Sequence, residues 1–426
     1  MLVGLWIDSP SDAVGASIVT SEEASEDVAT IDDDAALSTT SSQVPPVSAT
    51  VDQDASIVSQ IGNGAIVPGE PDITERPVPS EPSPWVTSTL ESLTVPELVS
   101  QLFVVELTPD NAAESLAIND WGGVFLKLEE EEPAFATEFI TGLQTTALDE
   151  GIGLIVSSDV EGGRIIKMPV DFHELPGLLG ETDREISSVN RRVAGELCGF
   201  GLNLNLAPVA DVDLLNNPVL RDGRSFSDDA SEVARYVDLF IDAYSETGGP
   251  IATTTKHFPG HGATNVDSHL GIANVGSRES LESLHLAPFE TAIAQYQTQP
   301  GAIMIGHLVV DGQTEPATFS NEIVSDWLRG DLGYDGVIIS DDLAAMEAIT
   351  DRPPSQRAID ALVAGIDLLL WVSPDDAATA REALIQEVFA NPNGEIAQRV
   401  DESVTTILTF KEQLGLHDSN ANRCGQ

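Results

Sequence analysis

The chain has 426 residues, and its 70 acidic and 19 basic residues give a formal net charge of −51 at pH 7. A surface of that charge repels nucleic acid and anionic lipid at moderate salt, so both classes of partner are excluded. Because the carboxylates also repel one another unless counterions screen them, the composition favours a salt-rich environment. Only four lysines occur, at positions 127, 167, 256 and 411.

The first part of the chain differs in composition from the rest. Residues 1–85 are rich in Ser, Thr, Asp, Glu, Ala and Pro and poor in large apolar residues. Such a segment cannot bury enough apolar surface to offset the entropy of ordering it, so we predict a disordered acidic segment. The apolar run at 1–7 is too short for a membrane span and has no basic residues before it. Export to the cell envelope and a cytoplasmic location both stay open, as does the oligomeric state.

Eight short apolar runs follow, and segments of helical periodicity separate them. The runs span residues 101–107, 122–128, 153–159, 202–208, 251–257, 302–307, 336–341 and 366–372. Near-continuous apolar runs are typical of strands buried on both faces, and intervening helices indicate parallel crossovers. Eight such units favour an α/β fold with a closed (β/α)8 TIM barrel over an open doubly wound sheet. We therefore predict one barrel domain over residues 86–415 and a flexible tail over residues 416–426.

Two helix starts are indicated by capping boxes, in which an N-cap threonine and a glutamate three residues later bind each other's backbone N–H groups. The first pair is Thr94 with Glu97, and the second is Thr182 with Glu185. Cys198 lies in the apolar stripe of the second helix. With only two cysteines in the chain, this position predicts a buried free thiol.

Titratable residues end or follow five consecutive apolar runs. They are Asp159, Asp211, Lys256 with His257, His307 and Asp341. A lone aspartate at such a position is commonly a capping residue. In a (β/α)8 barrel, however, the active site lies at the carboxyl ends of the strands. Five successive strands that bring titratable groups to one rim therefore indicate an enzyme site.

The segment from Lys256 to His269 reads KHFPGHGATNVDSH and holds three of the seven histidines in the chain. A structural loop and a metal site formed by His257, His261, Asp267 and His269 are two interpretations, although no HExxH spacing or cysteine pair supports the metal. The third and favoured interpretation is proton transfer. Asp267 and His269 are two residues apart, so in an extended loop the carboxylate orients the imidazole and raises its basicity.

In chain order, the segments DVEGGR, APVADV, GRSF, KHFPGHG, DSH, PATFS, GVIISDD and AGID resemble the bacterial β-N-acetylhexosaminidases of glycoside hydrolase family 3. The resemblance runs from about residue 93 to residue 411. It implies a single catalytic barrel in which Asp341 is the nucleophile, His269 is the acid/base and Asp267 is the partner of His269. Asp342 is a rival nucleophile, which strand alternation predicts to point away from the site.

The same resemblance assigns sugar binding to Asp159, Arg224, Lys256 and His257. Lys167 stands where the family pattern commonly has an arginine. A lysine cannot make the bidentate contact that an arginine makes with a substrate carboxylate or hydroxyl pair.

The activity expected from this resemblance is that of a retaining exo-β-N-acetylglucosaminidase. Its substrates would be amino-sugar glycosides with a terminal β-linked N-acetylhexosamine, such as cell-wall or chitin fragments, with no cofactor and no metal. A phosphorylase that uses phosphate as acceptor is a competing hypothesis, because a neutral imidazole does not repel an incoming anion. A β-glucosidase and a sugar-binding envelope protein without catalytic activity also stay open.

Overall fold

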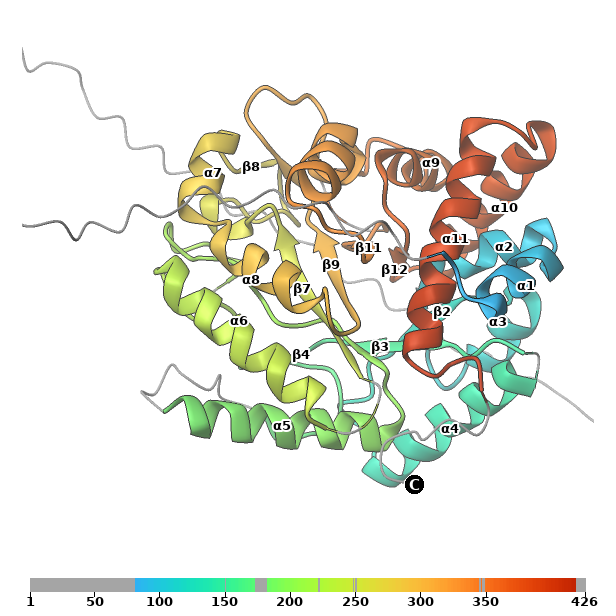
Figure 1. The fold of residues 1–426 in the computed structure, drawn as a ribbon, viewed down its shortest axis with the longest axis horizontal. Helices are drawn as coiled ribbons and strands as arrows, with labels where there is room; N and C mark the ends of the chain where they lie inside the picture. The colour runs from blue at the N-terminus through green and yellow to red at the C-terminus, as the bar shows by residue number, and fades with distance from the viewer. Residues whose placement is uncertain are drawn as a thin grey trace, which may run out of the picture. The chain divides into compact units, whose positions relative to one another are not determined.

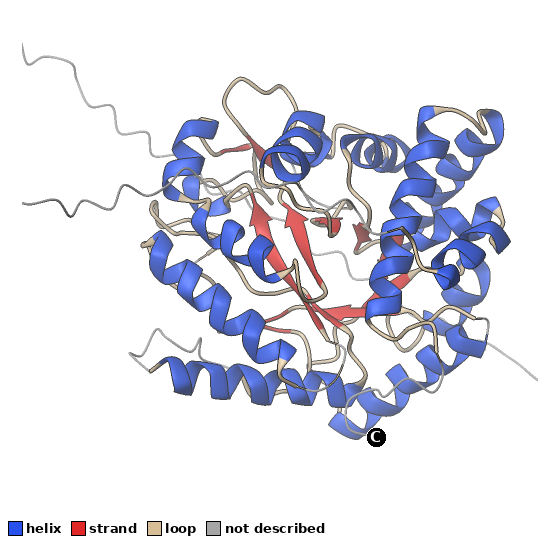
Figure 2. Cartoon of the chain, viewed as in Figure 1, coloured by secondary structure: helices blue, strands red, loops and turns tan. Residues whose placement is uncertain are grey.

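Short buried strands, each followed by one or more helices, make up the described part of the chain. The computed structural model describes residues 81–149, 151–172, 182–220, 223–247, 249, 251–344, 346 and 349–418. In these residues the strands lie inside and the helices lie around them (Figure 2). Most of the predicted acidic segment and the last eight residues of the predicted tail lie outside the described residues.

Eight parallel strands of the described residues form one sheet that closes on itself. They are β1 (Phe103–Glu106), β2 (Gly123–Phe125), β3 (Ile155–Ser158), β6 (Leu204–Asn205), β7 (Ala252–Phe258), β9 (Gly301–Ile305), β11 (Val337–Ser340) and β12 (Leu369–Trp371). The strands pair in this order, and β1 also pairs with β12. A parallel bridge between Ile339 and Leu368 joins β11 to the residue before β12. The eight predicted strands and the barrel are confirmed.

Helices cover the outside of the barrel (Figure 1). They are α1 (Pro84–Ser92), α2 (Val95–Gln101), α3 (Ala112–Asn119), α4 (Pro133–Asp149), α5 (Asp183–Phe200), α6 (Ala230–Ser245), α7 (Arg278–Leu284), α8 (Ala287–Gln295), the π-helix η3 (Glu322–Asp331), α9 (Pro354–Ala364), α10 (Pro374–Ala390) and α11 (Glu395–Gln413). Both predicted capping boxes are present, at the starts of α2 and α5. Among the described residues, no helix combines the length and the apolar character that crossing a membrane requires.

Smaller elements lie in the loops after the strands. They are β4 (Val160–Gly162), β5 (Ile165–Ile166), β8 (Ala273–Asn274), β10 (Leu308–Val309) and the short 3-10 helices η1 (His261–Ala263) and η2 (Ala317–Phe319). The antiparallel pair β4 and β5 follows β3, whereas β8 and β10 pair in parallel with each other. These additions build up the carboxyl-end rim of the barrel.

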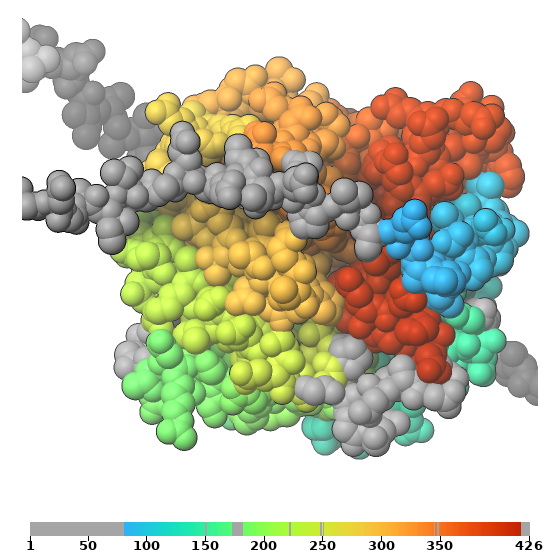
Figure 3. Space-filling view, viewed as in Figure 1, coloured from blue at the N-terminus to red at the C-terminus, as the bar shows by residue number. Residues whose placement is uncertain are grey.

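The beginning and the end of the barrel meet at α1 and α11. The helices at the blue end of the chain lie beside the red helices in Figure 3. The Ser83 hydroxyl donates to a carboxylate oxygen of Glu412 at 2.8 Å. Leu416, in the predicted tail, is buried, and its carbonyl accepts from the Gly153 N–H. Contacts with the barrel therefore continue into the first residues of that tail.

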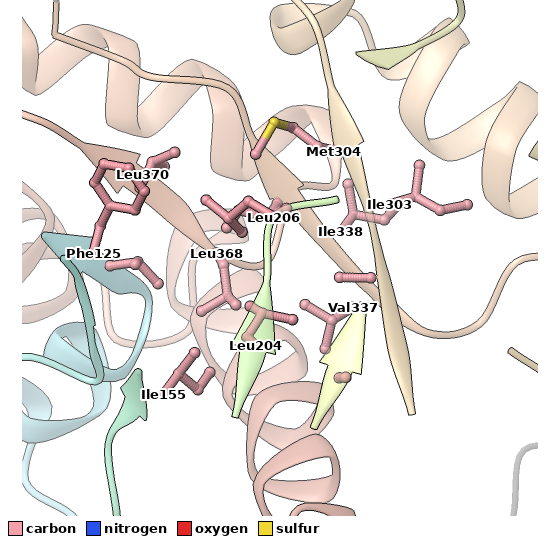
Figure 4. Packing of buried hydrophobic residues seen from close by; sticks show 14 of the residues in the cluster. Phe125, Ile155, Leu204, Leu206, Ile303, Met304, Val337, Ile338, Leu368 and Leu370 are labelled. Atoms are coloured by element: carbon pink, nitrogen blue, oxygen red, sulfur yellow. The ribbon is translucent and has the colours of Figure 1, made fainter. Parts of the chain in front are cut away.

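Apolar side chains fill the barrel interior. Side chains from β2, β9 and β12 and from the segment of β6 point toward one another in Figure 4, among them Phe125, Leu206, Met304 and Leu370. Burial of this surface supplies the main driving force for closing the sheet.

The prediction of a free thiol at Cys198 is wrong, because Cys198 is disulfide-bonded. Its side chain is buried in α5 as expected. The helical pattern shows which face of α5 is apolar, but it does not show which distant part of the chain approaches that face.

Lys411 is a buried lysine in α11, and its Nζ donates to the Gln101 Oε1 at 2.7 Å. Burial lowers the pKa of Lys411 to about 7, although Asp120 acts in the opposite direction. The ammonium group therefore loses its proton in the folded protein at a pH where the unfolded chain keeps it.

We predict that this group makes the protein more stable as pH rises from 7 to 9. In that range the unfolded chain binds one proton more than the folded protein, which adds about 1.4 kcal/mol per pH unit to the free energy of unfolding. Urea unfolding of the wild type and of Lys411→Met at pH 7, 8 and 9 measures the effect. The variant should lack this slope, and an equal slope in both proteins would refute the assignment.

Candidate active site

A cavity of about 270 Å³ opens at the carboxyl ends of the strands. Its floor includes Phe125, Leu206, Met304 and Leu370, which belong to the barrel core in Figure 4. Seven of the eight predicted site residues line it: Asp159, Lys167, Arg224, Lys256, His257, His269 and Asp341. The eighth, Asp267, is hydrogen-bonded to His269. The barrel thus brings together residues that are up to 182 positions apart, from Asp159 to Asp341.

One wall of the cavity is a charge cluster formed by Asp159, Glu161, Arg224 and Lys256. The Arg224 guanidinium donates from Nε and Nη2 to the two carboxylate oxygens of Glu161, at 2.7 and 2.8 Å. The Lys256 Nζ lies 2.6 Å from the Glu161 Oε1 and donates to the Asp159 Oδ1 at 2.5 Å. The side chains of Glu161 and Lys256 are only 1% and 3% exposed. The two cations and two anions therefore balance each other, and of the two carboxylates only that of Asp159 is partly exposed.

The local backbone explains how Glu161 reaches this position. Glu161 lies on β4, and the turn that leads to β5 holds Gly162 and Gly163 at φ angles of 91° and 61°. Glycine adopts these angles without the steric cost that a side chain would add. The EGGR segment is thus a tight turn that carries a buried carboxylate.

The cluster keeps its charges and retains free donors. Burial raises the pKa of Glu161, but Arg224 and Lys256 together lower it to about 2. Burial lowers the pKa of Lys256, but Asp159 and Glu161 raise it above its ordinary value. Lysine has three N–H donors and arginine has five. After the contacts with the carboxylates, and that of Arg224 with the Val219 carbonyl, both cations have N–H groups left for a ligand.

Asp211, which is fully buried, fixes His257. Its carboxylate accepts from the His257 Nδ1 at 2.7 Å and from the backbone N–H groups of His257 and His261. Burial raises the pKa of Asp211, but His257 and His261 lower it below its ordinary value. An ionised carboxylate only accepts hydrogen bonds, so Nδ1 carries the proton. The other ring nitrogen of His257, Nε2, is then left for a ligand at the cavity wall.

Asp341 follows β11 and lines the cavity. Burial raises the pKa of Asp341, but His257, His307, the Asp342 N–H and Lys256 lower it below its ordinary value. Asp341 is therefore an ionised carboxylate. Asp342 also borders the cavity. Its Oδ1, however, accepts from two backbone N–H groups, those of Ala344 and Val372.

His307, a strand-end residue in the sequence, supports the site from below and does not line the cavity. Its Nε2 lies 2.8 Å from the Asp342 carbonyl oxygen, and its Nδ1 lies 2.6 Å from the Thr318 hydroxyl. Burial lowers the pKa of His307. This contact fixes the backbone immediately after Asp341.

Asp267 and His269 form the pair predicted from their spacing. The His269 Nδ1 lies 2.7 Å from the Asp267 Oδ1, which also accepts from the His269 backbone N–H. Burial raises the pKa of Asp267, but the hydrogen bonds from His269 lower it. The carboxylate holds Nδ1 in its protonated form, so Nε2 is the nitrogen that can take up and release a proton. The His269 side chain is 55% exposed and lines the cavity.

Ser268, between these two residues, also lines the cavity and anchors the loop. Its hydroxyl lies 2.8 Å from the Nε2 of His261, and both side chains are buried. Burial lowers the pKa of His261 to about 4, so the ring is neutral near neutral pH. The Asn217 amide lies 2.8 Å from the His261 Nδ1 and donates to two loop carbonyls, those of His261 and Thr264. We call Asn217, His261 and Ser268 the loop anchor.

The four residues of the hypothetical metal site are thus divided between different hydrogen-bonded groups. His257 binds Asp211, His261 uses both ring nitrogens in the loop anchor, and His269 binds Asp267. Within the part of the chain that the structure describes, no three His, Cys, Asp or Glu side chains are placed to hold one metal ion.

Lys127 and Lys167 also line the cavity, and the Lys167 N–H donates to the Asp159 carbonyl at 2.8 Å. Lys127 pairs with Glu106 and Lys167 pairs with Glu129, each at 2.7 Å. Together with Lys256, three of the four lysines in the chain line this one cavity, while the fourth is buried in α11.

Three residues with roles at the site were not predicted as site residues from the sequence: Glu161, Asn217 and Ser268. Sequence motifs could have identified two of them, because Glu161 belongs to the EGGR segment and Ser268 stands between Asp267 and His269. Asn217 lies in an irregular loop, and no local pattern relates it to His261.

Comparisons with known proteins agree with this geometry. Residues 94–410 match the model of the glycosyl hydrolase family 3 N terminal domain. The chain is 34% identical over 277 residues to the beta-hexosaminidase LpqI of Mycobacterium tuberculosis, which covers 61% of this chain and 68% of that protein. A beta-hexosaminidase of Pseudomonas aeruginosa is 32% identical over 275 residues, covering 62% of this chain and 78% of that protein.

Solved structures show the same relationship. A glycoside hydrolase family 3 beta-N-acetylglucosaminidase from Paenibacillus sp. superimposes with a TM-score of 0.70 at 30% identity, covering 78% of this chain and 64% of that chain. A beta-N-acetylhexosaminidase from Beutenbergia cavernae gives a TM-score of 0.66 at 28% identity, covering 75% of this chain and 99% of that chain. With most of the barrel and its motifs matched, the chain belongs to glycosyl hydrolase family 3.

Proposed function

We propose that the chain is a retaining, exo-acting β-N-acetylglucosaminidase with Asp341 as nucleophile and His269 as acid/base. The observation that carries this proposal is the pairing, in one cavity, of an ionised carboxylate at a strand end with a histidine oriented by a second carboxylate. A carboxylate nucleophile and a proton donor are what a two-step displacement at the sugar C1 requires.

In the first step, a carboxylate oxygen of Asp341 attacks C1 while the His269 Nε2–H gives its proton to the glycosidic oxygen. The C1–O bond breaks, the aglycone leaves as an alcohol, and the sugar is held as an ester of Asp341. In the second step, a water oxygen attacks C1 while Nε2 takes the proton of the water. The ester bond then breaks and Asp341 is again a carboxylate. Two inversions at C1 give net retention of configuration.

The charge cluster and His257 are the proposed binding groups for the sugar hydroxyls. Arg224 and Lys256 offer N–H donors, Asp159 offers carboxylate oxygens and His257 offers its Nε2. Lys167, which also lines the cavity, is proposed as a further contact. A cavity of about 270 Å³ lies near the lower end of the range for ligand sites and suits one terminal sugar, which supports exo action.

The names of the relatives supply the substrate class. LpqI and its Pseudomonas counterpart are named beta-hexosaminidases, and the Paenibacillus protein is named a beta-N-acetylglucosaminidase. We therefore propose β-linked N-acetylhexosamine as the sugar that this chain removes.

The limits of the catalytic domain, residues 86 and 415, are also a proposal.

The nature of the acceptor distinguishes a hydrolase from a phosphorylase. Lys127 and Lys167 are cavity-lining cations outside the charge cluster, and Glu106 and Glu129 offset their charge. A phosphate dianion would need positive charge that is not already paired. This pairing supports water as the acceptor.

We predict that the nitrophenyl β-glycoside of N-acetylglucosamine is cleaved much faster than that of glucose, at a rate that added phosphate does not raise. Asp341→Asn should lower kcat/KM by at least about a thousandfold, because an amide cannot form the ester intermediate. The neighbouring Asp342→Asn is the matched control, and its kcat/KM should fall far less. Wild-type turnover in Asp341→Asn would exclude this nucleophile, and a sugar phosphate as the main product would show a phosphorylase.

We also predict that Ser268→Ala lowers kcat about tenfold with little change in KM. The variant removes the hydroxyl that the neutral His261 holds, so His269 spends less time in position, while the sugar contacts stay. Steady-state kinetics and the melting temperature separate this effect from loss of fold. Ser283→Ala, an exposed hydroxyl of α7 that bonds the Ser280 carbonyl, should behave as the wild type. An unchanged kcat in Ser268→Ala would show that the loop anchor does not position His269 for catalysis.

A further inference from the structure

Exposed apolar side chains of the described residues are concentrated on two loops, one of which carries His269. Nine large apolar residues are exposed in this part of the chain, and five of them lie on two loops at the carboxyl ends of β6 and β7. These five are Leu214, Leu215, Val266, Leu270 and Ile272. Leu270 and Ile272 closely follow His269 and are 81% and 67% exposed. Large apolar side chains gathered on one surface mark a binding surface more often than apolar residues scattered singly.

The two loops form one continuous wall. A Cβ added at Gly262 would lie 1.9 Å from the Val212 carbonyl oxygen, so the two backbones are in direct contact there. The Asn217 side chain donates to the Thr264 carbonyl of the other loop at 2.8 Å. Leu214 and Leu215 therefore lie between two points at which their loop is tied to the histidine loop.

This wall is poor in charge, although the chain as a whole is highly charged. Residues 212–220 and 259–272 contain no lysine or arginine, and their acidic residues are Asp213 and Asp267. Asp213 accepts from the Asn217 N–H, and Asp267 holds His269. The loop after β2, residues 127–132, carries one lysine and four glutamates. The rim loops thus differ in charge, and His269 belongs to one that is apolar and poor in charge.

We propose that these five residues are the aglycone subsite and that it takes an alkyl or aryl aglycone. The inference rests on the proposed function. An acid that protonates the glycosidic oxygen must lie within hydrogen-bond distance of it, so the aglycone is attached next to His269. Covering Leu270 and Ile272 with an apolar group removes their surface from water. A carboxylate on the aglycone would find no lysine or arginine in either loop segment.

The test is the dependence of kcat/KM on alkyl chain length, with methyl, butyl and hexyl β-N-acetylglucosaminides as probes. These alcohols have similar basicity, so the chemical step stays comparable. Burial of one methylene is worth about 0.8 kcal/mol, which is about fourfold in kcat/KM when burial is complete. Partial burial of the chain should still raise kcat/KM at least about tenfold from methyl to hexyl.

The Leu270→Ser/Ile272→Ser double variant should lower the hexyl to methyl ratio to about threefold or less, because it removes the apolar wall beside His269. The matched controls are Ile118→Ser on α3 and Phe389→Ser on α10, which are exposed at 67% and 63% and lie away from both loops. Both controls should keep the wild-type ratio.

The outcomes separate this inference from the proposed function. If neither the methyl nor the nitrophenyl glycoside is cleaved, the proposed function fails. If the methyl glycoside is cleaved but chain length has no effect, or the double variant keeps the wild-type ratio, the subsite is wrong. If the double variant changes the oligomeric mass of the protein in solution but not the hexyl to methyl ratio, the apolar surface is an interface between copies of the chain. This result would also overturn the proposal.

Discussion

The site depends on one buried carboxylate, that of Glu161, between two cations. Arg224 and Lys256 come from different barrel segments, and each would be costly to bury without a counter-charge. Glu161 provides that charge through two hydrogen bonds to Arg224 and a contact of 2.6 Å with Lys256. Because the pKa of Glu161 is lowered to about 2, this arrangement keeps its charge through the range in which most enzymes work. The proposed sugar contacts are the donors that remain after these bonds.

The catalytic groups are held by the same means, a carboxylate that fixes a partner. Asp211 fixes His257 and the backbone of His261, and Asp267 fixes His269. The loop anchor then ties the Asp267 and His269 segment to the loop after β6. The contacts of Asp211 and Asn217 join the ends of the neighbouring strands β6 and β7, so closing the barrel also assembles the site. This explains how a loop that leaves His269 more than half exposed still presents it to the cavity.

The sequence was sufficient for the features that depend on local patterns. Eight apolar runs predicted the eight strands, and Thr94 and Thr182 predicted two helix starts, because these signals arise within a few residues. The motifs also identified seven of the residues that line the cavity. Glu161 as the centre of the charge cluster, Asn217 in the loop anchor and the disulfide at Cys198 were not predicted. Each depends on a contact between distant segments, and no periodic pattern encodes such a contact.

The role of Glu161 can be measured directly by urea unfolding of Glu161→Gln against Glu129→Gln. Both variants remove one carboxylate that pairs with a lysine, but Glu161 is buried and Glu129 is 28% exposed. Loss of one partner of a buried ion pair costs about 3–5 kcal/mol, whereas an exposed pair is worth about 1 kcal/mol or less. We predict a loss of at least about 3 kcal/mol in unfolding free energy for Glu161→Gln and less than about 1 kcal/mol for Glu129→Gln. Equal stability of the two variants would contradict the central place given to Glu161.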